Sequence, residues 1–219
     1  RGSTSVPGVF VVNAQLPQHV GPGPLRSPDA TTDGPGHSVV LTCRLTADTA
    51  ARLGEDFCDG TASSSSSDDH SRSALRLLER FCATAPGESQ ESPRERGRFK
   101  VIAGVEDPRQ LPAIARSYNY KPALISKSGT LTRDPATGAL EMDINIFRFG
   151  FSSRSGLNLL APRFGDYVIN LAFLIEGRND DELPEQLLAA AQLRYCGLEE
   201  LAASLPPSPE DGAAHSASR

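Results

Sequence analysis

Three polar side chains alternate along the segment 140–149, LEMDINIFRF, and their spacing suits a chemical role. Glu141, Asp143 and Asn145 would share one face of an extended strand, about 7 Å apart at each step. Two carboxylates and an amide in a row could hold a cation or act as an acid–base pair. Such a pair also needs a nucleophile or a metal partner, and we find none with suitable spacing. The alternative interpretation is the solvated face of an antiparallel strand.

The other residue types that carry catalysis or bind metals are scattered. Cysteine occurs at Cys43, Cys58, Cys82 and Cys196, without C-x-x-C or other metal spacing, which favours reduced thiols inside a cell. Histidine occurs at His19, His37, His70 and His215, all in segments that we expect to be loops, insert or tail. No G-x-S-x-G motif with partners and no glycine-rich phosphate loop is present. The sequence therefore predicts no enzyme, no metal and no cofactor.

Cationic and aromatic side chains offer binding surfaces of another kind. The segment 94–100, RERGRFK, concentrates positive charge that could contact acidic lipid headgroups or form a solvated edge. Lys127 could meet a headgroup if its strand lines a cavity, or else extend over the surface of the sheet. The aromatic residues that would line such a cavity, or otherwise fill the core, are Phe147, Phe149, Phe151, Phe164 and Phe173.

Length and charge limit the class of protein further. The chain has 219 residues, enough for one domain with a core, and its net charge of -5 provides no basic surface for nucleic acid. No apolar stretch reaches the roughly 18 residues that a membrane span needs. Because the chain begins with Arg1 and not Met, we expect a piece of a longer product, fused to or acting with other domains. We predict a cytoplasmic protein that can contact membranes peripherally.

Alternating apolar residues predict about six strands. They fall in 8–16, 38–45, 98–105, 140–149 and 167–177, with a further candidate in 121–131. Four other segments lack large apolar residues, and we expect disorder in them. They are the inserts 17–37, 59–73 and 84–97 and the tail 204–219, within or after a single domain that spans 8–203.

Helical spacing predicts a short helix at 75–82, one or two turns in 108–118, and a helix in 153–166. A last helix follows the strand 167–177 directly. Asp181 is a suitable N-cap and Pro184 fits a first turn. Leu183 and Leu187 begin an apolar face that must lie on the sheet.

These elements predict an α+β fold, in which a curved antiparallel sheet of about six strands carries the C-terminal helix on one face. This order differs from that of a parallel βαβ fold. A long helix across a curved sheet also occurs in START-type, helix-grip proteins, an analogy at the level of fold alone.

The order of motifs resembles a known family. The strands VFVVNAQLP and HSVVLTCRL, then GRFKVI, KPALISK, LEMDINI and VINLAFLIEG with DELPEQLLAAAQL, are similar to the C-terminal domain of the plant Enhanced Disease Resistance 2 protein and its relatives. The resemblance covers roughly 8–195. The chain departs from the family pattern in three ways. It lacks a Trp within 107–112, it has Asn145 where a second Asp is usual, and its loops at 17–37 and 59–73 are longer.

The resemblance implies a regulatory role. In plants such a domain follows a phosphoinositide-binding pleckstrin-homology domain and a START domain. Those proteins are negative regulators of defence-related cell death and associate with membranes. No catalytic activity is implied for the domain itself, and Lys127 matches a lysine of the family pattern.

Two functions stay open. The first is a non-enzymatic module that binds a lipid or another apolar small molecule beneath the last helix, because each buried methylene supplies about 0.8 kcal/mol without catalytic geometry. Its ligand-binding residues would be Lys127, Phe147, Phe149, Phe164, Phe173, Leu183 and Leu187. The alternative is a protein–protein interaction domain with a filled core, which would use the acidic turn 180–185 or the inserts. An enzyme would need polar groups that converge in a pocket, which the sequence does not indicate.

Overall fold

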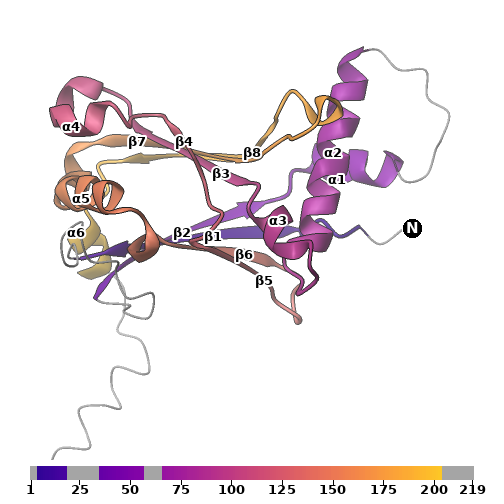
Figure 1. The fold of residues 1–219 in the computed structure, drawn as a ribbon, viewed down its shortest axis with the longest axis horizontal. Helices are drawn as coiled ribbons and strands as arrows, with labels where there is room; N and C mark the ends of the chain where they lie inside the picture. The colour runs from indigo at the N-terminus through magenta and orange to yellow at the C-terminus, as the bar shows by residue number, and fades with distance from the viewer. Residues whose placement is uncertain (1–3, 19–34, 57–65, 204–219) are drawn as a thin grey trace, which may run out of the picture.

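The computed structural model describes residues 4–18, 35–56 and 66–203. Its strands are β1 (Val9–Pro17), β2 (Gly36–Arg44), β3 (Phe99–Val105), β4 (Pro122–Leu124), β5 (Gly129–Arg133), β6 (Leu140–Asn145), β7 (Val168–Ile175) and β8 (Leu187–Arg194). They form two four-stranded sheets: sheet A in the order β2-β1-β6-β5 and sheet B in the order β4-β3-β7-β8. The two sheets lie one above the other (Figure 1).

Short helices lie at the two ends of this pair of sheets. The α-helices are α1 (Ala47–Asp56), α2 (Ser66–Thr84), α3 (Ser92–Arg96), α4 (Ala113–Arg116), α5 (Phe151–Leu160) and α6 (Leu198–Ala203). The 3-10 turns are η1 (Pro108–Gln110), η2 (Ile146–Arg148), η3 (Ala161–Asp166) and η4 (Asp180–Glu182). The first three α-helices cover one end and the last three cover the other (Figure 1).

The core lies between the two sheets and is built around stacked aromatic rings. Phe99 of β3 stacks on Phe10 of β1 and on Phe173 of β7, with both pairs of ring centroids 5.9 Å apart. Phe81 of α2 stacks on Phe99 as well, at 6.4 Å. Each of these rings is at most 7% exposed, and such stacked rings add to the stabilisation from apolar burial.

Sheet A confirms the predicted strands 8–16 and 38–45, which pair as a hairpin, and corrects the expectation of an antiparallel sheet. β1 pairs antiparallel with β2 from Val9 to Pro17, but it pairs parallel with β6. The inner face of each strand carries the apolar residues of its alternating pattern, including Val12 of β1 and Met142 of β6. The predicted α+β class is confirmed, but two sheets of four strands replace the single sheet of about six.

The prediction of a long C-terminal helix is wrong, because residues 187–194 form strand β8. The sequence LLAAAQLR fits both the period of a helix and the alternation of a strand. Its Leu and Ala residues cluster on a helical wheel, but Ala189, Ala191 and Leu193 also alternate with other residues as they would in a strand. β3 pairs with one edge of β7. The backbone N–H and C=O groups along the other edge of β7 also need partners, and β8 provides them. Tertiary pairing thus outweighs helix propensity. A START-type helix-grip arrangement is not confirmed, since the helix it requires is absent from the described residues.

Two predicted inserts are partly ordered. Residues 66–72 belong to α2, which buries Leu77, Phe81 and Cys82 against the core. Within 84–97, helix α3 buries Ser92 and Glu95. Both segments are poor in large apolar residues, and the prediction missed their order for different reasons: 66–72 begins a helix whose later turns enter the core, whereas 84–97 buries polar side chains. Residues 19–34, 57–65 and 204–219, which include the rest of the predicted disorder, lie outside the described residues.

The remaining elements were predicted correctly in kind. The turns in 108–118 are η1 and α4, and the segment 153–166 holds most of α5 and all of η3. Strands β3 and β7 occupy 98–105 and 167–177. The segment 121–131 divides into β4 and part of β5.

The acidic turn between β7 and β8 holds one end of the fold together through Glu182, which is 4% exposed. Its carboxylate accepts hydrogen bonds from the guanidinium groups of Arg80 and Arg98, the latter at 2.8 Å. It also accepts from the backbone N–H groups of Arg178 and Asn179, at 2.6 and 3.3 Å. Burial raises the pKa of this carboxyl, but the backbone N–H of Arg178 and the two guanidinium groups together outweigh burial and lower the pKa to about 2.

Carboxylates of the fold also hold two of the four cations in the segment 94–100. Arg98 is buried and donates to Glu95 at 3.1 Å as well as to Glu182. Lys100 donates to both carboxylate oxygens of Glu185, at 2.6 and 2.7 Å. Two of the cations considered for lipid headgroups are therefore held by carboxylates of the fold.

Candidate functional site

The structure does not bring the predicted ligand-binding residues around one cavity. Phe173 is part of the aromatic stack, and Phe164 of η3 packs against apolar core residues near the opposite end from α2. Phe147 and Phe149, in η2 and just after it, are half-buried. Lys127 is exposed between β4 and β5. The remaining two residues, Leu183 and Leu187, are 44% and 62% exposed.

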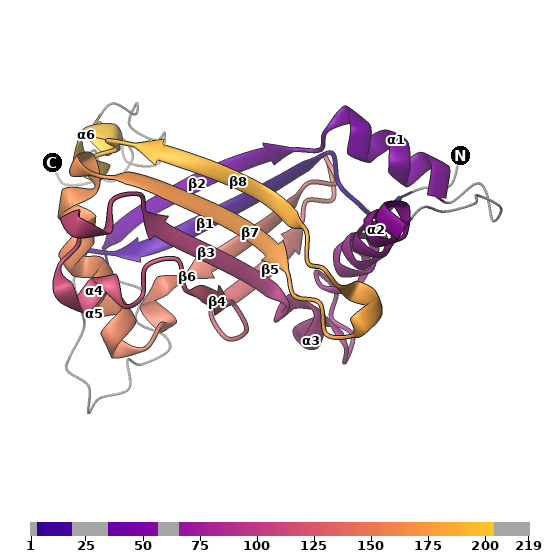
Figure 2. The same ribbon diagram turned by 90° about the horizontal axis from the view of Figure 1, so that it is seen from above.

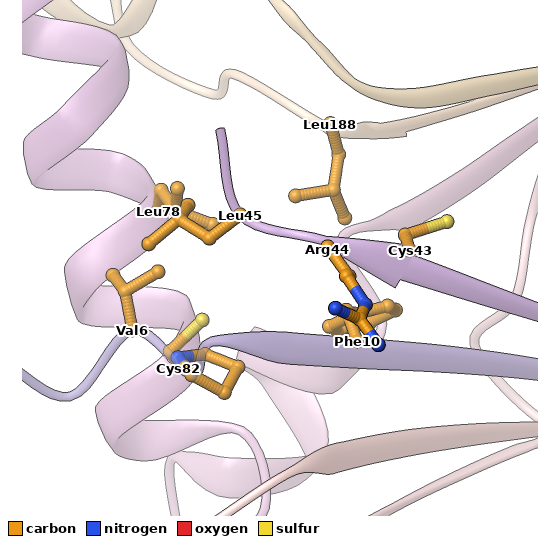
Figure 3. A pocket seen from close by; sticks show the side chains of 9 residues that line it. Val6, Phe10, Cys43, Arg44, Leu45, Leu78, Cys82 and Leu188 are labelled. Atoms are coloured by element: carbon orange, nitrogen blue, oxygen red, sulfur yellow. The ribbon is translucent and has the colours of Figure 1, made fainter. Parts of the chain in front are cut away.

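One small hollow, partly open to solvent, lies against the core. It has a volume of about 40 Å³ and lies between β1, β2, β8 and α2. Figure 3 shows the side chains around it, among them Phe10, Cys43, Leu78 and Leu188. A volume of this size admits about one water molecule and no acyl chain.

The polar face of β6 does not assemble a catalytic or metal site. Glu141 is exposed, and Asp143 accepts a hydrogen bond from Asn13 Nδ2 at 2.9 Å across the parallel pair. Within the described part of the chain, no group of three or more His, Cys, Asp or Glu side chains is placed to hold a metal ion. His37, which was expected in a loop, lies in β2 and contacts Glu199 of α6 at 3.2 Å.

A larger hollow lies on the outer face of sheet B, which no described helix crosses (Figure 2). We call it the sheet-B groove; its volume is about 350 Å³. Strand pairing places Pro122, Ile102, Ala172 and Ala190 in one row across all four strands. The full lining is Ile102, Tyr120, Asn170, Leu171, Ala172, Ala190, Ala191 and Gln192. The floor is therefore apolar and made largely of small side chains.

Tyr120 forms one wall of the groove. A Cβ atom at Gly104 would lie 2.6 Å from the Tyr120 ring, so glycine is what lets the ring lie against β3. Tyr120 has a left-handed backbone, with φ of 57°. Non-glycine residues rarely adopt this conformation, and surrounding contacts must hold it. One such contact is the hydrogen bond from its backbone N–H to the carbonyl of Ala103, at 3.0 Å.

A chain of polar side chains borders the groove on the same side as Tyr120. Asn170 Nδ2 donates to the Tyr120 hydroxyl at 2.8 Å, and Gln192 Nε2 donates to Asn170 Oδ1 at 2.9 Å. Gln192 Oε1 in turn accepts from Arg194 Nε at 2.6 Å. These polar groups hydrogen-bond to one another along one side of the groove, and the row Ile102, Ala172 and Ala190 beside them is apolar.

Two exposed leucines lie at the ends of the next row of paired residues, on the side of the groove away from Tyr120. The next row of paired residues contains Leu124, Lys100, Leu174 and Leu187. Leu124 and Leu187, at its two ends, are 45% and 62% exposed. Leu187, predicted to contact a ligand from a helix, thus lies in a strand one row away from the groove and is not among the residues that line it.

Comparison with protein families identifies the relatives of this fold. The sequence model described as Protein ENHANCED DISEASE RESISTANCE 2, C-terminal, matches residues 1–196. The chain belongs to this family. The Enhanced Disease Resistance 2 C-terminal motifs KPALISK and VINLAFLIEG contribute β4 and β7 to sheet B, and DELPEQLL contributes the buried Glu182 and the start of β8.

Comparisons with curated proteins and with solved structures found no match. No described helix is both long enough and apolar enough to cross a bilayer. The groove of this Enhanced Disease Resistance 2 C-terminal domain therefore has to be interpreted from its own chemistry.

Sequence reasoning missed the groove residues Ile102, Ala172 and Ala190, although one signal was available. β7 is apolar on most of both faces, which requires cover on both. The prediction supplied that cover with a helix from 183 onward. Because that segment is a strand instead, the outer face of β7 is left open.

Proposed function

We propose that this domain is a non-enzymatic interaction module, and that the sheet-B groove binds an apolar, helical segment of a partner protein or of another domain of the same product. The observation that carries the proposal is the apolar row Pro122–Ile102–Ala172–Ala190, which crosses the whole sheet and which no described helix covers. A sheet face with apolar side chains is usually buried against another layer. The alanines of the floor would let a helix approach closely.

The small size of the hollow between β1, β2, β8 and α2 supports this choice over a buried ligand. Its volume of about 40 Å³ has no room for an acyl chain, whereas the groove of about 350 Å³ is open along the surface. A partner helix would cover the exposed side chains of Leu124 and Leu187 together with the floor. Removing such apolar area from water stabilises a complex by about 25 cal/mol per Å² before association costs.

A photo-crosslinking experiment tests the proposal. A photoreactive amino acid is placed at Ala190, in the groove, or at Thr132, exposed on sheet A, and the crosslinked peptides from the native cell extract are sequenced. We expect the probe at Ala190 to select one amphipathic segment. A synthetic peptide of that segment should bind the wild type and lose at least about tenfold in affinity on Ala190→Arg. Thr132→Arg is the matched control and should bind as the wild type does.

Equal binding by both arginine variants would refute the groove as the interface. Identical crosslinked peptides from the probes at Ala190 and Thr132 would refute it as well.

Lipid binding is the second candidate, because the groove volume falls within the range of about 300–1,000 Å³ found for small-molecule sites. Native mass spectrometry after incubation with a lipid panel distinguishes the two. A lipid adduct that Ala190→Arg removes and Thr132→Arg keeps would assign the groove to a lipid and support peripheral membrane contact. A peptide complex without any lipid adduct would assign it to a protein.

A further inference from the structure

Helix α5, at the other end of the molecule from α2, buries a charge that no described residue neutralises (Figure 1). Arg154 is 4% exposed, and its Nε is shielded from water without a hydrogen-bond acceptor. Within residues 4–18, 35–56 and 66–203, no carboxylate forms an ion pair with it. The guanidinium group of arginine carries a fixed positive charge in proteins.

A buried, uncompensated cation costs several kcal/mol, which makes an unpartnered Arg154 unusual in a native core. The buried guanidinium of Arg98, at the other end of the fold, is compensated in the usual way, because it forms ion pairs with two carboxylates. Arg154 lies on the same face of α5 as Leu157, which packs against the core. Its place therefore suits a bound anion.

The first turn of α5 offers further donors for such an anion. Gly150 is its N-cap and has no side chain, so no side-chain cap satisfies the first backbone N–H groups. These groups carry the positive end of the helix dipole. Ser152 and Ser153 add exposed hydroxyls in the same turn. Long side chains in a helix point back toward its N-terminus, which directs the Arg154 guanidinium toward this turn.

We propose that Arg154 and the N-terminal turn of α5 form a binding site for a phosphate group. Arginine binds phosphate oxygens through paired N–H donors, and helix N-termini bind the same group through backbone N–H. The phosphate could be free in solution or belong to a lipid headgroup. This site lies apart from the sheet-B groove and does not depend on the function proposed for it.

Thermal unfolding in inorganic phosphate, at constant ionic strength set with chloride, tests the site. We expect the melting temperature of the wild type to rise with phosphate concentration, because a ligand of the folded state stabilises it. Arg154→Met should bind phosphate at least about tenfold more weakly, since bonds to charged groups are the strong ones. Arg76→Gln, an exposed site on α2, removes the same charge and should keep the wild-type response.

A second variant covers the case in which Arg154→Met does not fold. Ser153→Asp places a carboxylate in the exposed first turn of α5 and should abolish the phosphate-dependent rise while the protein stays folded. A rise that Arg154→Met or Ser153→Asp leaves unchanged would overturn the proposal. No response of the wild type to phosphate or to phosphate-bearing vesicles would overturn it as well.

Sedimentation with vesicles identifies the source of the phosphate. Vesicles of phosphatidylcholine with phosphatidic acid are compared with vesicles of phosphatidylcholine alone. Binding to the first that Arg154→Met abolishes assigns the site to a lipid headgroup. Binding of free phosphate alone, with the same dependence on Arg154, assigns it to a soluble ligand, and either result supports the site.

Discussion

Glu182 should make the stability of this domain depend on pH within a window that the contacts of the carboxylate define. The pKa of about 2 lies below the ordinary value of 4.5. Because one pKa unit corresponds to about 1.4 kcal/mol, the difference corresponds to about 3 kcal/mol of stability. A lowered carboxyl pKa stabilises the folded state fully above pH 4.5, and this stabilisation is lost as the pH falls toward 2.

The perturbation is Glu182→Gln, measured by urea unfolding between pH 7 and pH 3. At neutral pH the variant should lose at least about 3 kcal/mol, since it also leaves the buried Arg98 without one carboxylate partner. The difference in unfolding free energy between wild type and variant should then shrink by about 2 kcal/mol from pH 6 to pH 3. Taking this difference cancels the titration of other groups, including Asp107, whose pKa is lowered by its hydrogen bond from Arg109.

Asp181→Asn is the matched control, because Asp181 is the exposed neighbour in the same turn. It should change stability by less than about 0.5 kcal/mol at every pH. A gap between wild type and Glu182→Gln that is equal at pH 6 and pH 3 would refute the assignment of the lowered pKa. An equal loss in Asp181→Asn would show that charge in the turn, rather than the buried contacts, sets the stability.

Three further predictions concern the core, the groove and the thiols. Phe99→Ala should cost about 3–5 kcal/mol in urea unfolding because it removes the central ring of the stack, whereas Leu187→Ala at an exposed site should cost far less; equal costs would contradict the proposed core. Gly104→Ala should cost about 1–3 kcal/mol by displacing Tyr120, and adding Tyr120→Ala should recover part of that loss; additive costs in the double-mutant cycle would exclude the clash. Cys82 should resist a thiol reagent at pH 8 until urea unfolds the protein, since burial raises its pKa to about 12. Peptide mapping measures the labelling, and a Cys82 labelled as fast as the half-buried Cys196 would contradict its burial.

The strands of this fold could be predicted because alternation along each of them is nearly complete. In β6, for example, Leu140, Met142 and Ile144 are all buried, whereas Glu141 between them is exposed. Such a pattern fixes which face is inside, but it does not fix which strands become neighbours. The division into two sheets and the parallel pairing of β1 with β6 depend on contacts across more than 100 residues, which no local period reports.

The errors have two physical causes. The segment 187–194 has strong helix formers, yet a free edge of β7 pairs with it as a strand. Glu95 was placed in a disordered insert and the acidic turn that contains Glu182 was interpreted as the cap of a helix, because acidic residues are rarely buried, but the buried Arg98 pairs with both. The groove was missed because the segment 187–194 was predicted to be a helix. The partners of Arg98 were missed because burial of the acidic residues was not expected.

The position of β1 sets the order in which the domain can be completed during synthesis. Among the strands of this domain, β1 is synthesised first but lies in the middle of sheet A, and its inner neighbour β6 follows about 130 residues later, as the bond between Asn13 and Asp143 shows. Until then the edge of β1 that pairs with β6 is open, a natural target for chaperones or for mispairing. Trimming the first seventeen residues would likewise split the sheet through its middle, so an expression clone has to begin upstream of Val6, whose side chain is already buried.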